Sequence, residues 1–223
     1  MNQEVLRLSK KLETILDKLD ENQRYIIGVS GVPGSGKTTF VNKFVEDFNK
    51  HHPGDTVVAI SMDGFHLPKA ALDKMSNREE AYLRRGVHWT FDPEGIIQLI
   101  KSLKADTTKT IMAPTFDHKI GDPVKDGICI KPNHRIVIIE GIYLHLKSPE
   151  PWEQIPLLLD EKWFIPVDLE EARRRVGNRH YESGIEKSVE DGIKRYNNND
   201  LLNAEFILKN RYTDAEDINI NLQ

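Results

Sequence analysis

A glycine-rich stretch between an apolar run and an amphipathic segment constrains this chain more than any other feature. Residues 31–38 read Gly-Val-Pro-Gly-Ser-Gly-Lys-Thr and fit the pattern G-x-x-x-x-G-K-S/T. The apolar run 25–29 before them predicts a buried strand, and residues 38–49 after them carry phenylalanine and valine at helical spacing. Because a strand, a glycine turn and a helix in this order aim backbone N–H groups and the positive helix end at one point, the pattern predicts a phosphate-binding loop.

Each residue type in this loop has a chemical reason to be there. Glycines let the backbone curl so that successive N–H groups face phosphate oxygens. The Lys37 side chain can reach the β- and γ-phosphates of a nucleotide, and the Thr38 hydroxyl can bind Mg²⁺. A chance match is the alternative, and the flanking strand and helix argue against it. We therefore expect ATP and Mg²⁺ as cofactors, with the nucleotide bound by Gly31, Val32, Pro33, Gly34, Ser35, Gly36, Lys37, Thr38 and Thr39.

Apolar runs alternate with amphipathic segments along the rest of the chain. Strands are expected at 25–29, 56–60, 110–113, 135–139 and 163–167, with short late ones at 206–208 and 218–220. Helices are expected over 5–19, 38–49, 93–103 and most of 169–194, with a break at 197–200, whereas 114–134 reads as irregular. Apolar runs with little alternation favour a parallel sheet buried on both faces. The predicted fold is a three-layer α/β/α domain with a mostly parallel sheet of about five strands.

Length and composition exclude several classes of protein. The 223 residues suit one domain over 1–223, with an N-terminal helix within 1–22. No run approaches about 18 apolar residues, so no membrane span is expected, and the charged N-terminus does not read as a secretory signal. The single cysteine, Cys129, excludes an internal disulfide and suits a cytoplasmic location. A net charge of −4 disfavours nucleic acid as a partner.

Two carboxylates follow predicted strands. Asp63 comes after 56–60, and Glu140 comes directly after 135–139. Because ligands of open α/β sheets bind beyond the carboxyl ends of the strands, both acids are expected near the phosphates. Asp63 could take the proton from an attacking alcohol, and Glu140 could hold Mg²⁺ or orient a substrate. The alternatives are an Asp-Gly turn at Asp63 and a merely solvated acid at Glu140.

The motifs together, in this order, resemble the uridine kinase, phosphoribulokinase and pantothenate kinase family. The resemblance covers about residues 24–210. The segment 84–92 of this chain resembles the corresponding segment of pantothenate kinases and of the bacterial fructose-kinase-like and uncharacterised fungal branches of the family. The segments that carry it are Met62–His66, Arg84–Asp92, Pro114–His118, Ile139–Ile142, Arg173–Arg179 and Asn199–Ala204.

This resemblance implies a P-loop NTPase fold with a helical arginine-rich lid at about 169–196 and a substrate-side insertion at about 64–92. It implies transfer of the ATP γ-phosphate to a hydroxyl of a small metabolite: a nucleoside, a pantothenate-like alcohol or a sugar. Asn203 is then expected near the adenine. The substrate is expected at Arg84, Arg85, Asp92, His118 and Glu140. Asp92 could equally cap the helix at Pro93, Arg84 and Arg85 could form a surface turn or hold Asp92, and His118 could be structural.

Residues 170–195 hold seven basic and six acidic side chains. A solvated helix with ion pairs between successive turns is one interpretation, and a lid whose arginines close over the phosphates is the other. We take Arg174 and Arg179 as the lid arginines. The predicted catalytic set is then Asp63, Lys37, Arg174 and Arg179, and the predicted metal set is Thr38, Glu140 and Asp63.

A function without an acceptor is the alternative hypothesis. The same loop could serve a nucleotide-dependent switch or regulatory protein, although the two strand-end acids and the arginines favour a kinase. The expected partners are ATP or ADP and a small acceptor, with no nucleic acid and no membrane. The apolar stripe of 5–19 either packs on the domain or forms a dimer contact, so both a monomer and a homodimer fit the sequence.

Overall fold

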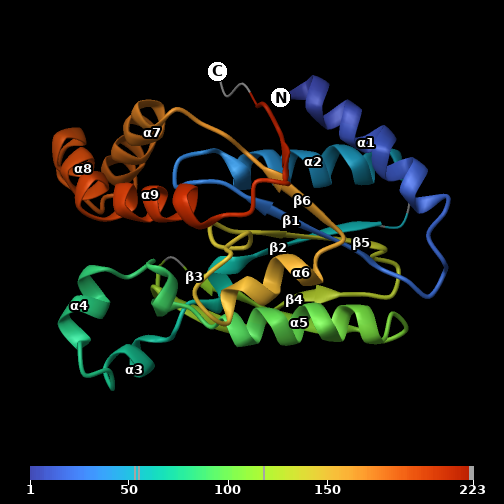
Figure 1. Ribbon diagram of the computed structural model, residues 1–223, viewed down its shortest axis with the longest axis horizontal. Coiled ribbons are helices and arrows are strands. Elements are labelled where there is room, and N and C mark those ends of the chain that lie inside the picture. Colours follow the sequence, from blue (N-terminus) through green and yellow to red (C-terminus); the bar gives the residue numbers. More distant parts are fainter. Residues whose placement is uncertain (53, 55, 118, 221–223) are drawn as a thin grey trace.

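A parallel five-stranded sheet forms the centre of the protein (Figure 1). The computed structural model describes residues 1–52, 54, 56–117 and 119–220. The strand order is β2-β5-β1-β6-β7, and within the part of the chain that the structure describes each pair of neighbouring strands in this sheet is parallel. The strands are β1 (Tyr25–Ser30), β2 (Val57–Ser61), β5 (Ile136–Glu140), β6 (Glu161–Phe164) and β7 (Glu216–Asp217). The predicted parallel sheet is confirmed.

Helices cover both faces of this sheet, which makes the predicted three layers. On one face lie α1 (Asn2–Leu16) and α2 (Lys37–His51), and on the other lie α5 (Pro93–Ala105) and α6 (Ile155–Leu158) (Figure 1). Alternate residues of β1 serve the two faces, because Ile27 packs with the phenylalanines of α2 while Ile26 packs with the isoleucines of α5. Burying such side chains contributes about 1.5–3 kcal/mol each.

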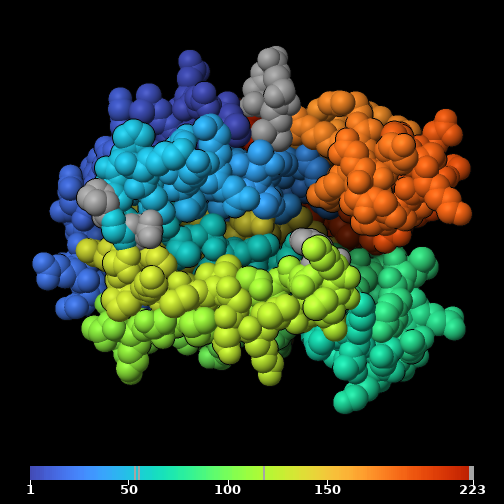
Figure 2. Space-filling model, turned by 180° about the vertical axis from the view of Figure 1, so that it is seen from behind, coloured from blue at the N-terminus to red at the C-terminus, as the bar shows by residue number. Residues whose placement is uncertain are grey.

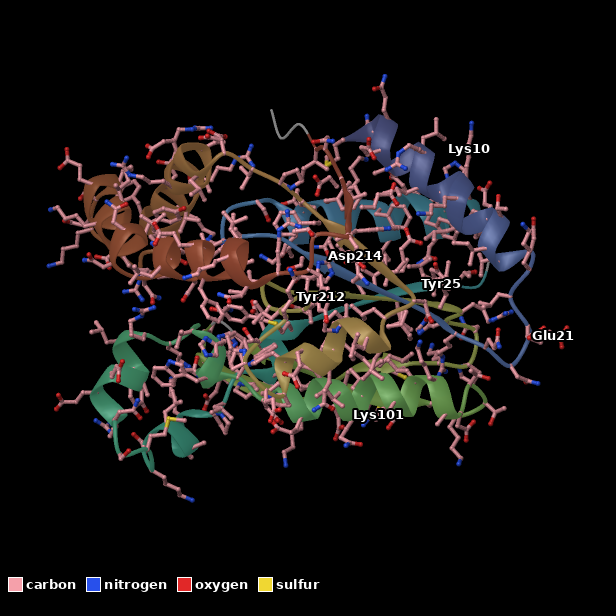
Figure 3. All side chains as sticks on the ribbon, in the orientation of Figure 1. Lys10, Glu21, Tyr25, Lys101, Tyr212 and Asp214 are labelled. Carbon is pink, nitrogen blue, oxygen red and sulfur yellow. The ribbon has the colours of Figure 1, made fainter. Side chains whose placement is uncertain are left out.

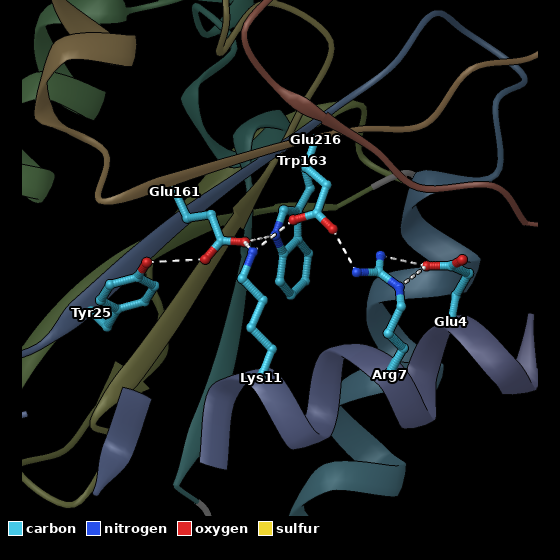
Figure 4. A network of polar contacts seen from close by, with 7 residues as sticks. All are labelled: Glu4, Arg7, Lys11, Tyr25, Glu161, Trp163 and Glu216. Carbon is cyan, nitrogen blue, oxygen red and sulfur yellow. Dashed lines mark hydrogen bonds and ion pairs between the residues drawn. The ribbon is translucent and has the colours of Figure 1, made fainter. Parts of the chain in front are cut away.

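The N-terminal helix α1 docks on the domain through both apolar and charged contacts. Val5, Leu8 and Leu12 are buried against α2 and the sheet. On the same helix, Arg7 and Lys11 each lie 2.6 Å from the Glu216 carboxylate of β7 (Figure 4). The apolar stripe predicted at 5–19 is therefore used within the chain.

A β-hairpin corrects the expectation that 114–134 is irregular. The strands β3 (Ile111–Asp117) and β4 (Asp122–Ile130) pair antiparallel in a separate two-stranded sheet. The expected strand 110–113 is therefore part of this hairpin, and β7 is the fifth strand of the central sheet. Pro114 lies at the register shift between Ala113 and Thr115, where a residue without an N–H is tolerated.

The C-terminal third differs from expectation in three places, and the first is the expected strand 218–220, because the strand of this region, β7, ends at Asp217. Residues 197–200 do not break the helix, because a π-helical turn, Tyr196–Asp200, joins α8 (Val189–Arg195) to α9 (Leu201–Asn210). The expected strand 206–208 lies within α9, since a three-residue apolar run does not distinguish a strand from a helix. The helix expected over 169–194 is confirmed as α7 (Leu169–Glu182) and α8, separated by a turn at Gly184.

Two helical regions lie at the same end of the sheet. One is the arginine-rich segment, α7 and α8, and the other is the pair α3 (Lys69–Leu72) and α4 (Arg78–Leu83). Figures 1 and 2 both show the arginine-rich segment above α3 and α4, from opposite sides of the molecule. Glu140 at the carboxyl end of β5, Arg85 just after α4 and Arg179 of α7 line the same cavity.

After α9 the chain returns to the sheet beside β6. Tyr212 and Asp214, labelled in Figure 3, lie in this returning segment. The Tyr212 N–H donates to the carbonyl oxygen of His145 at 2.8 Å, and Asp214 pairs with Lys162 at 2.9 Å. The His145 side chain is 1% exposed, and its Nε2 lies 3.0 Å from the carbonyl oxygen of Gly28.

His145 is expected to make folding stability depend on pH. Burial lowers its pKa from 6.5 to about 4. Between these values the unfolded chain binds more protons than the folded one, so the free energy of unfolding decreases as pH falls from 6.5 to 4 and is fully retained above 6.5. Across this pH range the free energy of unfolding is expected to fall by about 3 kcal/mol. His145→Gln retains an amide donor for Gly28 and is expected to flatten this dependence in urea unfolding at pH 7, 6, 5 and 4.5. Equal pH slopes for the variant and the wild type would contradict this role.

Candidate active site

The glycine loop folds as its sequence predicts, between β1 and the start of α2. Gly34 and Gly36 have φ of 82° and 87°, a region that other residues seldom adopt. A Cβ at Gly34 would also lie 2.7 Å from the carbonyl oxygen of Ala172 in α7. The loop and the arginine-rich segment therefore touch, and a side chain at Gly34 would separate them.

Two cavities meet at this loop. The phosphate pocket, of ≈190 Å³, is lined by Gly34, Gly36, Lys37, Thr38, Thr39, Arg175, Val176 and Arg179. The inner chamber, of ≈230 Å³, is lined by Pro33, Lys37, Thr38, Asp63, His66, Arg85, Gly86, Phe91, Glu140, Ile142, Arg179, Asn199, Asp200 and Asn203. Both cavities share Lys37, Thr38 and Arg179. A group bound in one therefore meets a group bound in the other at these three side chains.

Glu140 lies where β5 ends, as expected, and is only 5% exposed. The hydroxyls of Ser61 and Thr38 donate hydrogen bonds to its carboxylate. Burial raises the pKa of Glu140, while Lys37 and these two hydroxyls oppose the rise. The carboxylate is thus tied to the hydroxyl at the start of α2 that the loop pattern assigns to the metal.

Asp63 lies two residues beyond the end of β2, on the 3₁₀ turn Met62–Phe65. Its N–H donates to the Ser61 hydroxyl at 3.3 Å, which fixes the start of the turn. A Cβ at Gly64 would lie 2.3 Å from the carbonyl oxygen of Pro114, so the hairpin packs directly on this turn. Lys37 faces both acids: withdrawal from water lowers the pKa of Lys37, and the Glu140 and Asp63 carboxylates oppose that change.

The donor set fits Mg²⁺. Thr38 and Glu140 offer hard oxygen ligands beside the phosphate pocket, and Mg²⁺ commonly binds one or two carboxylates together with substrate phosphates. Within the part of the chain that the structure describes, no group of three or more His, Cys, Asp or Glu residues could hold a metal alone. This arrangement suits a metal held jointly with a nucleotide.

The structure brings one of the two expected lid arginines to the cavities. Arg179 lines both of them. Arg174 is 64% exposed, pairs with Glu171 at 2.8 Å and lines a hollow on the outer side of α7. Arg175 lines the phosphate pocket instead, with its guanidinium 3.4 Å from the carbonyl oxygen of Gly34. Helix spacing could have found this pair, because Arg175 and Arg179 are four residues apart and share a face.

The expected substrate residues are divided among several environments. Arg85 lines the inner chamber, but it pairs with Asp122 at 3.0 Å rather than with Asp92. Arg84 binds the side-chain oxygens of Asn199 and Asn203 at 2.9 and 3.4 Å.

Asp92 lies outside the chamber lining. It is exposed, and its carboxylate accepts the Gly95 N–H at 2.9 Å, so it caps α5 as the alternative interpretation held. His118 lies outside the described residues.

The 199–204 motif contributes more to the inner chamber than expected. Asn203 is buried, its side-chain NH₂ lies 3.5 Å from the Gly86 carbonyl oxygen, and it lines the inner chamber. Asn199 and Asp200 also line the chamber and were not among the expected site residues. The sequence could have pointed to them, because Asn199 and Asp200 belong to the same motif as Asn203.

The profile of the Phosphoribulokinase / Uridine kinase family matches residues 26–170. The chain belongs to this family. It is an ATP-dependent small-molecule kinase of the P-loop NTPase fold. Among the described residues, no helix is long and apolar enough to span a membrane.

Two kinds of relative support the assignment. A protein of Schizosaccharomyces pombe, named as a candidate uridine kinase, is 41% identical over 89% of this chain and 84% of its own length. A solved structure titled as a candidate kinase of a fructose transport system, from a Silicibacter species, has a TM-score of 0.80 with 27% identity over 95% and 98% of the two chains. The structure of YFH7 from Saccharomyces cerevisiae has a TM-score of 0.87 with 22% identity over 98% and 99%, and shows the shared fold.

Proposed function

We propose that this kinase transfers the γ-phosphate of ATP to a hydroxyl group of a small metabolite held in the inner chamber, with Asp63 as the general base. The observation that carries the proposal is the junction of the two cavities. Lys37, Thr38 and Arg179 line both, and Asp63 faces the inner one. A phosphate in the first cavity and an alcohol in the second would meet at this junction.

The residues divide the chemistry among them. The acceptor oxygen attacks the γ-phosphorus, its proton passes to the Asp63 carboxylate, and the bond from phosphorus to the β-bridging oxygen breaks. Lys37 and Arg179 stabilise the charge on the transferring group. Thr38 and Glu140 would hold Mg²⁺, which supplies further charge neutralisation. Closure of the arginine-rich segment would exclude water, so that transfer goes to the alcohol rather than to hydrolysis.

The names of the relatives point to more than one acceptor. One relative is named as a candidate uridine kinase and one as a candidate kinase of a fructose transport system, so both a nucleoside and a sugar are acceptors to test. The test is therefore ATP consumption with Mg²⁺ across uridine, cytidine, nicotinamide riboside, pantothenate, fructose, ribose, glycerate and ribulose 5-phosphate. Phosphorylated products are identified by mass spectrometry.

We expect one acceptor class to raise turnover far above the acceptor-free rate. Tight ATP binding without any acceptor-dependent turnover would contradict the proposal. That outcome would favour the nucleotide-dependent switch, which requires no acceptor.

A further inference from the structure

Arg84 follows the last residue of α4 and lies beside the inner chamber without lining it. The helix α4 ends at Leu83, and the Arg84 N–H donates to the carbonyl oxygen of Glu80 at 2.7 Å. Arg84 lines an outer groove of ≈480 Å³ between α4 and α8, and it is absent from the described lining of the inner chamber. Arg84 can therefore act on a ligand in that chamber through the groups that its guanidinium holds.

The guanidinium of Arg84 holds two amides that do line the inner chamber. Its Nε donates to the Oδ1 atom of Asn199 at 2.9 Å, and its Nη2 donates to the Oδ1 atom of Asn203 at 3.4 Å. A guanidinium has donors only, so it binds the oxygen of an amide and not the nitrogen. Hydrogen bonds from a charged donor are stronger than those between neutral groups. Arg84 thus fixes which way both amides are turned.

The NH₂ groups of the two asparagines remain available as donors. One N–H of Asn203 can reach the Gly86 carbonyl oxygen, 3.5 Å away, and the Tyr143 hydroxyl donates to that same oxygen at 2.8 Å. The second N–H of Asn203 is then left over. The Asn199 NH₂ makes no hydrogen bond to the part of the chain that the structure describes. The chamber wall therefore offers amide donors whose orientation is set from outside the chamber.

We propose that Arg84 is a positioning residue for the acceptor, because it turns the Asn199 and Asn203 amides so that their NH₂ groups donate to an acceptor oxygen. This inference rests on the proposed function. The last torsion of an asparagine side chain has two broad minima, so without Arg84 each amide could present either its oxygen or its nitrogen. An amide oxygen turned toward an acceptor oxygen would offer no hydrogen bond unless that oxygen carried a proton.

Neither asparagine lines the phosphate pocket. The proposal therefore predicts an effect on the acceptor and not on ATP. In Arg84→Met, which keeps an unbranched side chain but removes the donors, we expect KM for the best acceptor of the panel to rise by about tenfold. The kcat and the KM for ATP are expected to stay within about twofold. Steady-state kinetics with each substrate varied in turn measures the three values.

Two variants at arginine positions accompany this measurement. Arg84→Lys keeps a charged donor but loses the planar fork that reaches both amides, so we expect KM for the acceptor to rise by only about threefold. Arg78→Met is the matched control on the same helix. Arg78 makes an exposed pair with Asp73 at 2.8 Å, and its loss is expected to leave all three values unchanged.

Asn199→Asp separates the orientation of the amide from a purely structural bond. The aspartate keeps an oxygen for Arg84 and strengthens that bond, but it replaces the NH₂ group with a second oxygen. We expect KM for the acceptor to rise by at least about tenfold. Asn198→Asp adds the same charge one residue away, in the outer groove and outside the described chamber lining, and is expected to stay within about twofold of the wild type.

The outcomes distinguish this inference from the function beneath it. An unchanged KM for the acceptor in Arg84→Met overturns the inference, and so does an equal rise in KM for acceptor and ATP, because general loosening of this region would change both. Wild-type acceptor KM in Asn199→Asp also overturns it, and this variant decides the question if Arg84→Met does not fold. Failure of the wild type with every acceptor contradicts the proposed function itself.

Discussion

Replacement of Asp63 by asparagine is expected to reduce acceptor-dependent turnover by about 10²–10⁴-fold. Asparagine has nearly the same shape, and the N–H bond to Ser61 that positions the turn is a backbone bond, so the chamber should keep its form. What is lost is the carboxylate that takes the proton of the attacking hydroxyl. Steady-state kinetics with the best acceptor measures the loss in kcat.

ATP binding provides the second readout for Asp63. Because Asp63 lines the inner chamber and not the phosphate pocket, we expect the Kd for ATP to change by less than about threefold. Asp92→Asn is the matched control, since Asp92 caps α5 outside the chamber and asparagine is also a good cap. If Asp63→Asn lost ATP affinity and turnover to a similar extent, Asp63 would act in nucleotide binding and not in proton transfer.

The central layers of the fold could be predicted because their signals are local. The glycine loop lies between a continuous apolar run and a helix with an apolar face, and both survive in the structure as β1 and α2. The same holds for β2 and β5, whose runs end at Ser61 and Glu140 and thereby deliver the two acids to one edge of the sheet. Strand ends are enough to place a carboxylate when all the strands are parallel.

The hairpin and the π-helical turn could not be predicted because partners distant in sequence decide them. Residues 111–130 contain prolines and glycines that are typical of loops, and their strand character comes from pairing β3 with β4. Residues 197–200 are polar and read as a break, yet buried Tyr196 and Ala204 on either side pack into the core and keep the chain helical. The consequence for the site is direct, since this turn brings Asn199 and Asp200 to the inner chamber.

The arginines of α7 show the same limit within the site. Spacing alone indicates that Arg175 and Arg179 share a helix face, but which face of α7 meets the glycine loop is decided by packing. Likewise, the sequence does not show that Arg85 pairs with Asp122, or that Arg84 binds Asn199 and Asn203. Residue type therefore predicted a basic site, and packing decided which cations are available.

Replacement of Arg179 by alanine is expected to reduce kcat by at least about 100-fold, whereas Arg174→Ala stays within about twofold of the wild type. The two substitutions remove the same group from the same helix, α7, five residues apart. Arg179 lines both cavities and would lie over the phosphate as it moves between them. Arg174 makes an exposed pair with Glu171, and such surface pairs contribute little.

Comparing Arg179→Ala with Arg174→Ala tests whether the position of the arginine matters or only the total positive charge of α7. If α7 acted only through its summed positive field, the two alanine variants would lose similar activity, and raising the salt concentration would remove much of the difference from wild type. A loss confined to Arg179 and insensitive to salt is the expected result, because a guanidinium in contact with the transferring group is shielded from the solvent ions. Equal losses would show that the face of the helix does not matter, and would contradict the assignment of Arg179 to the transfer step.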